Sequence, residues 1–317
     1  MNDQFEALAR TLEESGAYRI LRHFEPRDRY GDDPGTGLRR LMVLDTETTG
    51  LDCEQHKILE LGYVVARFDP ATGKIIDVVD RYNGLQDPGE PVPPEITRLC
   101  GITDEDVRGQ ALDDERIEQA IGAADLIIAH NARFDRGFVE KRYPCAENAW
   151  WACSRVEGPW EAMQMGSTKL EWLAFKVAGL FYGAHRALTD AELLLHLLSC
   201  PAHDETPVLR HILESSRRMT HCVWATNSPF DKKDALKIER RFQWSDGSDP
   251  RTPIKAWYKD GVPAGELEAL LDDLRTHIYE GRGVMIVDDL TGRERFTHRV
   301  KNRRDVSATK DEPTSEQ

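Results

Sequence analysis

The chain has 317 residues, 40% of them hydrophobic and 31% charged, which is enough for one large or two modest globular domains with a sizeable core. No run of eighteen apolar residues occurs and the acidic N-terminus lacks a signal-peptide core, so we expect no membrane span. The net charge of −14 disfavours tight, non-specific duplex binding, which depends on many Lys and Arg contacts to phosphate.

The six cysteines form no C-x-x-C pair. We therefore expect buried or incidental thiols in a reducing compartment, with the cytoplasm as the location. The chain also lacks a clustered Cys and His motif, which argues against a structural zinc site.

The first 37 residues are expected to form a short helix and a linker. Phe5, Leu8 and Leu12 recur near helical spacing, which indicates an amphipathic helix within residues 1–22. Residues 25–37 are rich in proline and glycine, as is typical of a loop.

The next segment is an apolar run, residues 41–44, that predicts a buried strand. Asp45 and Glu47 follow it within Asp45-Thr46-Glu47-Thr48-Thr49-Gly50. Side chains two apart in a strand point to the same face, so both carboxylates should point toward one place.

Further strands and helices follow in chain order. Residues 58–68 and 74–82 predict two strands of a hairpin, and residues 125–129 predict another strand. Helices are predicted at 132–143, 168–179 and 187–198. Asp135 lies on the first of these helices and Asp190 on the last, with His185 just before it. Four carboxylates and one imidazole in this order indicate an oxygen-rich site for divalent cations.

These motifs resemble the DEDDh branch of the DnaQ-like 3′-5′ exonucleases, which includes the proofreading epsilon subunit of bacterial DNA polymerase III, ribonuclease T and oligoribonuclease. The matching stretches are residues 45–50, residues 126–135 and His185-Arg186-Ala187-Leu188-Thr189-Asp190. Residues 58–62 and 101–103 carry smaller similarities. The resemblance spans about residues 38–200 and implies a ribonuclease-H-like α/β fold, with a mixed sheet flanked by helices.

The resemblance also implies a two-metal mechanism with two divalent cations, Mg²⁺ or Mn²⁺. Asp45, Glu47, Asp135 and Asp190 would be the metal ligands, and Asp45 would bridge both cations. His185 would be the general base, a role that suits an imidazole because histidine titrates near neutral pH.

Contacts to the substrate are implied at Thr46, Thr48, His130 and Asn131. Simpler interpretations exist for single motifs. A D-x-E after a strand is often a solvated turn, Asn131 is also a good helix cap, and Asp190 is also a favourable acid in the first turn of a helix. These simpler interpretations would all have to hold together.

Beyond residue 200 the composition changes. We expect a linker helix within residues 201–222, a small aromatic-rich α+β module at 223–290, and a basic then polar disordered tail at 291–317. Residues 293–304 hold six Lys or Arg and one acid, which suits either nucleic-acid contact or a solvated tail. The aromatics of the module suit either its own core or the stacking of single-stranded bases, and we favour the core.

The predicted function is metal-dependent 3′-5′ exonuclease activity on single-stranded or frayed DNA ends, with release of nucleoside 5′-monophosphates. One alternative is an exoribonuclease of the ribonuclease T or oligoribonuclease type. Another is a non-catalytic scaffold subunit that binds nucleic acid. Expected partners are nucleic-acid 3′ ends and a polymerase or another replication or repair protein, without a membrane.

Overall fold

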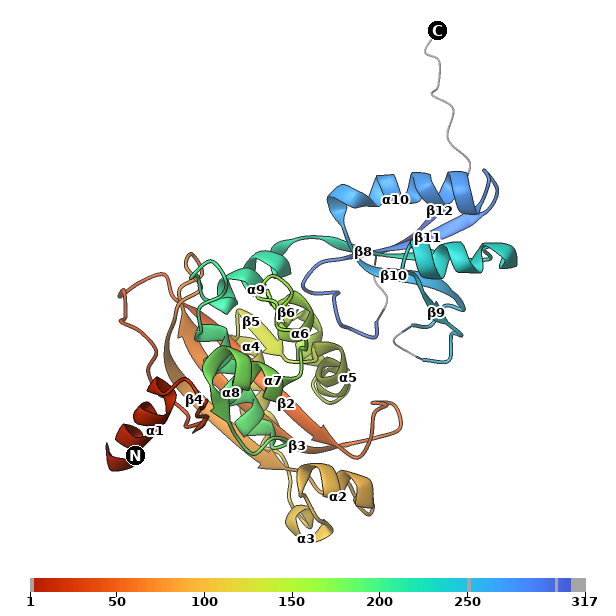
Figure 1. Cartoon of the computed structure of the whole chain (residues 1–317). Coiled ribbons are helices and arrows are strands. Elements are labelled where there is room, and N and C mark those ends of the chain that lie inside the picture. Colours follow the sequence, from red (N-terminus) through yellow and green to blue (C-terminus); the bar gives the residue numbers. More distant parts are fainter. Residues whose placement is uncertain (1–2, 250–251, 300–301, 309–317) are drawn as a thin grey trace. The chain divides into compact units, whose positions relative to one another are not determined.

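The computed structural model describes residues 3–249, 252–299 and 302–308 and divides into two compact units, the first ending at Leu213 and the second beginning at Glu214 (Figure 1). Within the described residues, no helix has the length and apolar character needed to cross a membrane.

The first unit is built on a five-stranded sheet with the strand order β4-β3-β2-β5-β6. Strands β2 to β4 are antiparallel neighbours, whereas β5 and β6 run parallel to β2. The mixed sheet flanked by helices confirms the predicted ribonuclease-H-like α/β fold. The strands are β2 (Arg39–Thr48), β3 (Ile58–Phe68), β4 (Ile75–Leu85), β5 (Leu126–Ala129) and β6 (Trp151–Cys153).

Helices surround this sheet, and a short parallel pair of strands lies beside it. The helices predicted at 132–143 and 187–198 are confirmed to within one residue at each end, as α5 and α8. The elements are α1 (Asp3–Glu14), β1 (Arg22–His23), α2 (Pro94–Cys100), α3 (Asp104–Val107), α4 (Asp114–Ala123), α5 (Ala132–Arg142), η1 (Pro144–Asn148), α6 (Ser154–Glu157), α7 (Leu170–Leu173), η2 (Ala174–Ala178), β7 (Leu180–Phe181), α8 (Ala187–Ser199) and α9 (Val208–Arg217).

Three helices between β4 and β5 were not predicted. Their start signals are nevertheless present in the sequence. Pro94 occupies the first turn of α2, and the Asp113 side chain accepts the backbone N–H of Arg116 at the start of α4. A proline in the first turn and an aspartate cap are ordinary helix-start signals. The predicted helix at 168–179 begins later, at Leu170, and continues from α7 into the π-helix η2.

The main core of the first unit lies between the sheet and α8. Leu41 and Val43 of β2 and Val64 of β3 are fully buried on one face, against a run of leucines from α8. Met42 and Leu44 alternate with them and are just as buried. Both faces of β2 are therefore covered, which explains why its sequence is an unbroken apolar run.

The helix expected within residues 201–222 is α9, which begins in the first unit and continues past its end at Leu213, and its first half also belongs to the core of that unit. Val208, Leu209 and Ile212 of α9 are fully buried in the same core as α8 and the sheet. The helix is strongly amphipathic, and its apolar face completes the core of the first unit. Residues 22–24 are also part of the fold, because Phe24 is buried in this core and β1 pairs with β7.

One glycine decides how closely α8 approaches the sheet. A Cβ at Gly62 of β3 would lie 2.1 Å from the backbone nitrogen of Leu188 and 2.4 Å from the carbonyl carbon of Ala187. Because these are backbone atoms, no side-chain movement relieves the overlap. The missing side chain therefore lets the first turn of α8 rest directly on β3.

We expect Gly62→Ala to lower the free energy of unfolding by about 1–3 kcal/mol, because the new methyl group overpacks a backbone contact. Gly122→Ala is the matched control: a Cβ there meets nothing within 4 Å, and alanine in helix α4 should add about 0.5–1 kcal/mol. Urea denaturation followed by circular dichroism measures both changes. Equal stabilities of the two variants would contradict the prediction.

The second unit contains a five-stranded antiparallel sheet with the order β12-β11-β8-β10-β9. Helical segments pack their leucines on one face, where Leu271, Leu274 and Ile278 meet Val223 and Val287. The elements are β8 (Thr220–Ala225), η3 (Phe230–Lys232), η4 (Ala235–Glu239), β9 (Gln243–Ser245), β10 (Ala256–Pro263), η5 (Ala264–Glu266), α10 (Leu267–Asp273), η6 (Leu274–Ile278), β11 (Val284–Leu290) and β12 (Arg303–Ser307).

The prediction of a disordered tail from residue 291 is wrong for residues 303–307. They form β12, which pairs with β11 along its whole length. Val306 is 8% exposed and packs into the core of the unit. The strand covers an edge of β11 that would otherwise present unpaired backbone groups. Residues 309–317 lie outside the described residues.

Candidate active site

Three of the predicted ligands converge at the end of β2. Asp45 and Glu47 extend from alternate positions of this strand, and Asp190 comes from the first turn of α8. Each contributes a carboxylate oxygen, and these oxygens all lie within 4.8 Å of one another. An all-oxygen group of this size suits a hard divalent cation such as Mg²⁺ or Mn²⁺.

Asp190 is held in place by the segment that precedes α8. Tyr182 donates its hydroxyl proton to Oδ1 at 2.6 Å, and the backbone N–H groups of His185 and Arg186 donate to Oδ2 at 2.9 and 3.2 Å. His185 has a φ of 66°, a left-handed conformation uncommon for residues other than glycine. This turn leaves the His185 side chain exposed. Burial raises the pKa of Asp190, against the hydrogen bonds from Tyr182 and the two backbone N–H groups.

Asp135 approaches from α5 and is 2% exposed. Its Oδ1 accepts the backbone N–H of Thr46 at 3.0 Å and the Thr46 hydroxyl at 2.9 Å. Thr46 stands between Asp45 and Glu47 on β2, so these hydrogen bonds tie α5 to the strand that carries both acids. Asp135 is not one of the three residues whose carboxylate oxygens lie within 4.8 Å of one another.

A fifth carboxylate, Glu60, organises the site from β3. It is completely buried and lies opposite Glu47 in the sheet register. It accepts hydrogen bonds from the Arg186 guanidinium at 2.8 Å, from the Ala187 backbone N–H at 3.1 Å and from the Asn83 amide at 2.9 Å. Glu60 thus fixes the start of α8. From the sequence, residues 58–62 carry only a small similarity to the family, and this role of Glu60 is not predicted. The signal for it in the sequence is a lone acid between apolar strand residues.

The carboxylates raise one another's pKa values. Burial raises the pKa of Glu47 to about 8, helped by the charges of Asp190 and Glu60. Burial raises the pKa of Asp135 to about 7, against the hydrogen bonds from Thr46. Burial and the surrounding acids hold the pKa of Asp45 well above its usual range. Such a cluster favours a bound cation, which replaces the protons.

We expect the metal-free protein to lose stability as the pH rises. Between the usual glutamate pKa of 4.5 and the folded value of about 8, the unfolded chain releases a proton that folded Glu47 retains, so folding becomes less favourable until pH 8. The melting temperature of Glu47→Gln in EDTA should therefore exceed that of wild type by an amount that grows from pH 5 to pH 8, about 2–4 °C for each kcal/mol.

Differential scanning calorimetry at several pH values measures this difference in melting temperature. Saturating Mg²⁺ should reverse the order, because only wild type keeps the full ligand set. If the difference in melting temperature between Glu47→Gln and wild type stays constant with pH, ionisation of Glu47 is not the cause of the pH-dependent loss of stability.

The four residues expected to contact substrate have different surroundings. Thr46 is engaged with Asp135, and the Thr48 hydroxyl donates to the Gly50 carbonyl at 2.6 Å. His130 Nε2 lies 2.6 Å from the Thr168 carbonyl and Nδ1 lies 2.8 Å from the Ser154 hydroxyl. Burial lowers the pKa of His130 to about 4, which favours a neutral ring. Asn131 is exposed at the N-cap of α5, and its side chain forms no capping hydrogen bond. Direct substrate contact by these residues stays a prediction.

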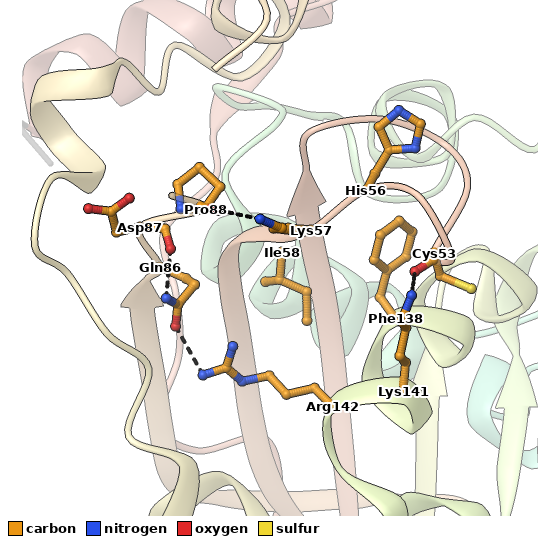
Figure 2. Close-up of a pocket in the computed structure, with 10 residues that line it drawn as sticks. All are labelled: Cys53, His56, Lys57, Ile58, Gln86, Asp87, Pro88, Phe138, Lys141 and Arg142. Carbon is orange, nitrogen blue, oxygen red and sulfur yellow. Dashed lines mark hydrogen bonds between the residues drawn. The ribbon is translucent and has the colours of Figure 1, made fainter. Parts of the chain in front are cut away.

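The loop after the first motif is held by α5. Figure 2 shows Lys141 of α5 reaching the Cys53 carbonyl, at 2.6 Å, beside a pocket of about 190 Å³. Across the pocket, Lys57 donates to the Pro88 carbonyl at 2.7 Å. A Cβ at Gly50 would lie 2.2 Å from the His56 ring, so the glycine that ends the first motif lets His56 pack against the loop.

A second group of possible metal ligands was not predicted. His203, Asp204 and His211 place ligand atoms within 4.8 Å of one another at the turn between α8 and α9. His211 Nε2 lies 3.1 Å from both Asp204 Oδ1 and the Thr206 hydroxyl. Both His203 and Asp204 are exposed, and the turn is separate from the carboxylates on β2.

Part of the chain is similar to known exonucleases and DNA polymerase III components. Residues 42–149 match the family RNase_T, described as exonuclease. A PolC-type DNA polymerase III from Halalkalibacterium halodurans is 33% identical over 215 residues, covering 62% of this chain but 14% of that much longer relative. A DNA polymerase III subunit epsilon from Treponema pallidum is 26% identical over 205 residues, covering 62% of this chain and 87% of the relative.

Two solved structures give partial matches. Exonuclease X in complex with 5′ overhanging duplex DNA is 27% identical, with a TM-score of 0.36, and the match covers 49% of this chain and 89% of that one. Exonuclease I of E. coli in complex with a dA16 oligonucleotide is 16% identical, with a TM-score of 0.43 and coverages of 58% and 48%. Residues 42–149 thus match an exonuclease family, and the chain is similar to bacterial DNA polymerase III components.

Proposed function

We propose that the chain is a two-metal-ion 3′-5′ exonuclease of the DEDDh type, which hydrolyses phosphodiester bonds at the 3′ ends of DNA and releases nucleoside 5′-monophosphates. The observation that carries the proposal is the convergence of Asp45, Glu47 and Asp190 within 4.8 Å, with Asp135 tied to the same strand through Thr46. The match of residues 42–149 to an exonuclease family supports the same chemistry.

The donor set fits divalent cations. Carboxylate oxygens are the ligands that Mg²⁺ and Mn²⁺ prefer, and the raised pKa values of Glu47 and Asp135 mark a site that gains from positive charge. When bound, two such cations would activate water and stabilise charge on the attacking and leaving oxygens. Asp45, Glu47 and Asp190 would hold one cation, and Asp45 and Asp135 would hold the other.

His185 is the proposed general base. Its side chain is exposed at the start of α8, and its backbone N–H is bonded to Asp190, so the imidazole is carried by the same turn that positions a metal ligand. A histidine there can accept the proton of the attacking water and release it to solvent. Glu60 and Gly62 position this turn without contacting substrate.

The proposed substrate is the 3′ end of single-stranded or frayed DNA, because the similar proteins are DNA polymerase III components. By the same similarity, the proposed partner is a polymerase or another replication or repair protein. The proposed location is the cytoplasm, and it is supported by six cysteines that are all free thiols.

We expect wild-type protein with Mg²⁺ or Mn²⁺ to shorten a 5′-labelled single-stranded DNA from its 3′ end, and EDTA to stop it. Asp45→Asn should lower the rate by roughly 10³-fold or more, because it removes a ligand to the cations. His185→Ala should lower it by about 10²–10⁴-fold while cation binding persists, because only proton transfer is lost. Denaturing gels follow the ladder, and isothermal titration calorimetry follows Mg²⁺ or Mn²⁺ binding.

Asp204→Asn is the matched control, because it removes a carboxylate from the separate His203, Asp204 and His211 group; it should cleave like wild type. RNA of the same sequence tests the exoribonuclease alternative. If the protein cleaves this RNA faster than the DNA, its substrate is RNA. Unchanged cleavage by Asp45→Asn would overturn the mechanism, and no cleavage of either polymer would favour the scaffold alternative.

A further inference from the structure

Two tryptophans form an aromatic surface at the edge of the sheet in the second unit. Trp244 of β9 and Trp257 of β10 are direct partners in the strand register. Their ring centroids lie 5.5 Å apart with an edge-to-face angle of 63°. β9 is the last strand of this sheet, so nothing in the sheet covers the outer side of Trp244.

The core of the unit does not use Trp244. Trp224 and Phe242 are each 3% exposed, which confirms for them the prediction that the module spends aromatics on its own core. Trp244 is 52% exposed, and Trp257 is half-buried at the margin of that core. A large apolar ring left half in water adds little to stability. Its exposure therefore points to a ligand rather than to folding.

Two lysines lie beside Trp257 in the sequence. Lys259 lies two positions after Trp257 on β10 and so on its face of the sheet, and Lys255 immediately precedes the strand. Across the described ranges, neither lysine forms a salt bridge. By contrast, Lys232 of the same unit is paired with Glu280 at 2.9 Å.

The geometry of the pair is rigid. On the opposite face, the Tyr258 hydroxyl donates to the Gln243 side chain at 2.9 Å and links β10 to β9. Tyr258 also packs against Trp224, with ring centroids 5.0 Å apart. Contacts on the opposite face of the sheet therefore hold together the two strands that carry the indoles. Such preorganisation lowers the entropy cost of binding a ligand.

Charge is divided unevenly between the two units. Residues 1–213 hold 23 Lys and Arg against 37 Asp and Glu, whereas residues 214–317 hold 19 of each. All of the net negative charge lies in the nuclease unit. A polyanion is therefore repelled less by the second unit, and binding there adds the affinity that an acidic nuclease lacks.

We propose that Trp244 and Trp257 form a base-stacking site for single-stranded DNA, with Lys255 and Lys259 holding its phosphates. This inference rests on the proposed function, because it supplies a second grip on the strand that the nuclease site would shorten. Exposed aromatics beside cations bind single strands without sequence preference, since every base has a stacking face and every linkage a charge.

The test is fluorescence anisotropy of labelled (dT)16 with the full chain carrying Asp45→Asn, which prevents cleavage. Adding Trp244→Ala should weaken binding at least about 10-fold, whereas Trp244→Phe should retain most of it because a stacking face remains. Lys259→Ala should weaken binding and reduce the slope of log K against log salt by about 0.7. Lys232→Ala, whose lysine is already paired, is the matched control and should change neither quantity.

Circular dichroism confirms that each variant folds. Binding of Trp244→Ala within twofold of the Asp45→Asn parent would overturn the proposal, as would an unchanged salt slope in Lys259→Ala. Analytical ultracentrifugation can also contradict the proposal. If the parent protein is a dimer and Trp244→Ala makes it a monomer, the surface is an interface with a second copy of the chain. Cleavage by the wild-type chain is measured separately. A failure of DNA binding with intact cleavage contradicts only this inference, and a failure of cleavage with intact binding contradicts only the proposed function.

Discussion

The contact between β3 and the first turn of α8 governs the nuclease unit. Gly62 has no side chain, so the helix rests on the strand, and the buried carboxylate of Glu60 accepts hydrogen bonds from Arg186 and the Ala187 backbone N–H. Asp190 lies one turn into this helix and meets Asp45, which is the register partner of Gly62. Because backbone atoms cannot rotate away as side chains can, the close contact at Gly62 fixes the distance between α8 and β3. That distance sets the spacing between Asp190 and Asp45.

Ionising the buried carboxylates of this site is unfavourable when no cation is bound. Four acids gather where burial removes water and raises their pKa values, and a fifth carboxylate, Glu60, is paired with Arg186. The surrounding core is dense enough to hold them, because β2 is apolar on both faces and α8 is almost entirely buried. A large core thus supports a locally unstable cluster, a common relation between stability and function.

The second unit differs from the first in its charge balance. With 19 charges of each sign and its own core of leucines and valines, it folds around an antiparallel sheet and leaves Trp244 half in water. In the proposed mechanism, the first unit carries the acids that would bind cations and that would also repel a nucleic-acid strand. A separate stacking surface in the second unit, as we propose, would let the first unit keep its negative charge.

The fold class, the central strands and several helices of the first unit, and the residues that form the acidic cluster could be predicted from the sequence alone. Their signals are local: an apolar strand, a two-residue spacing and a helical period are visible in a short window. Helices α2 to α4 were not predicted although their start signals are present in the sequence, and β12 was not predicted because its pairing with β11 is not local. Three features could not be predicted from the sequence. They are the role of Glu60, the packing of the first half of α9 into the core of the first unit, and the exposure of Trp244 in contrast to the burial of Trp224. Each of these depends on which residue distant in the chain packs against it, and a local pattern carries no information about that partner.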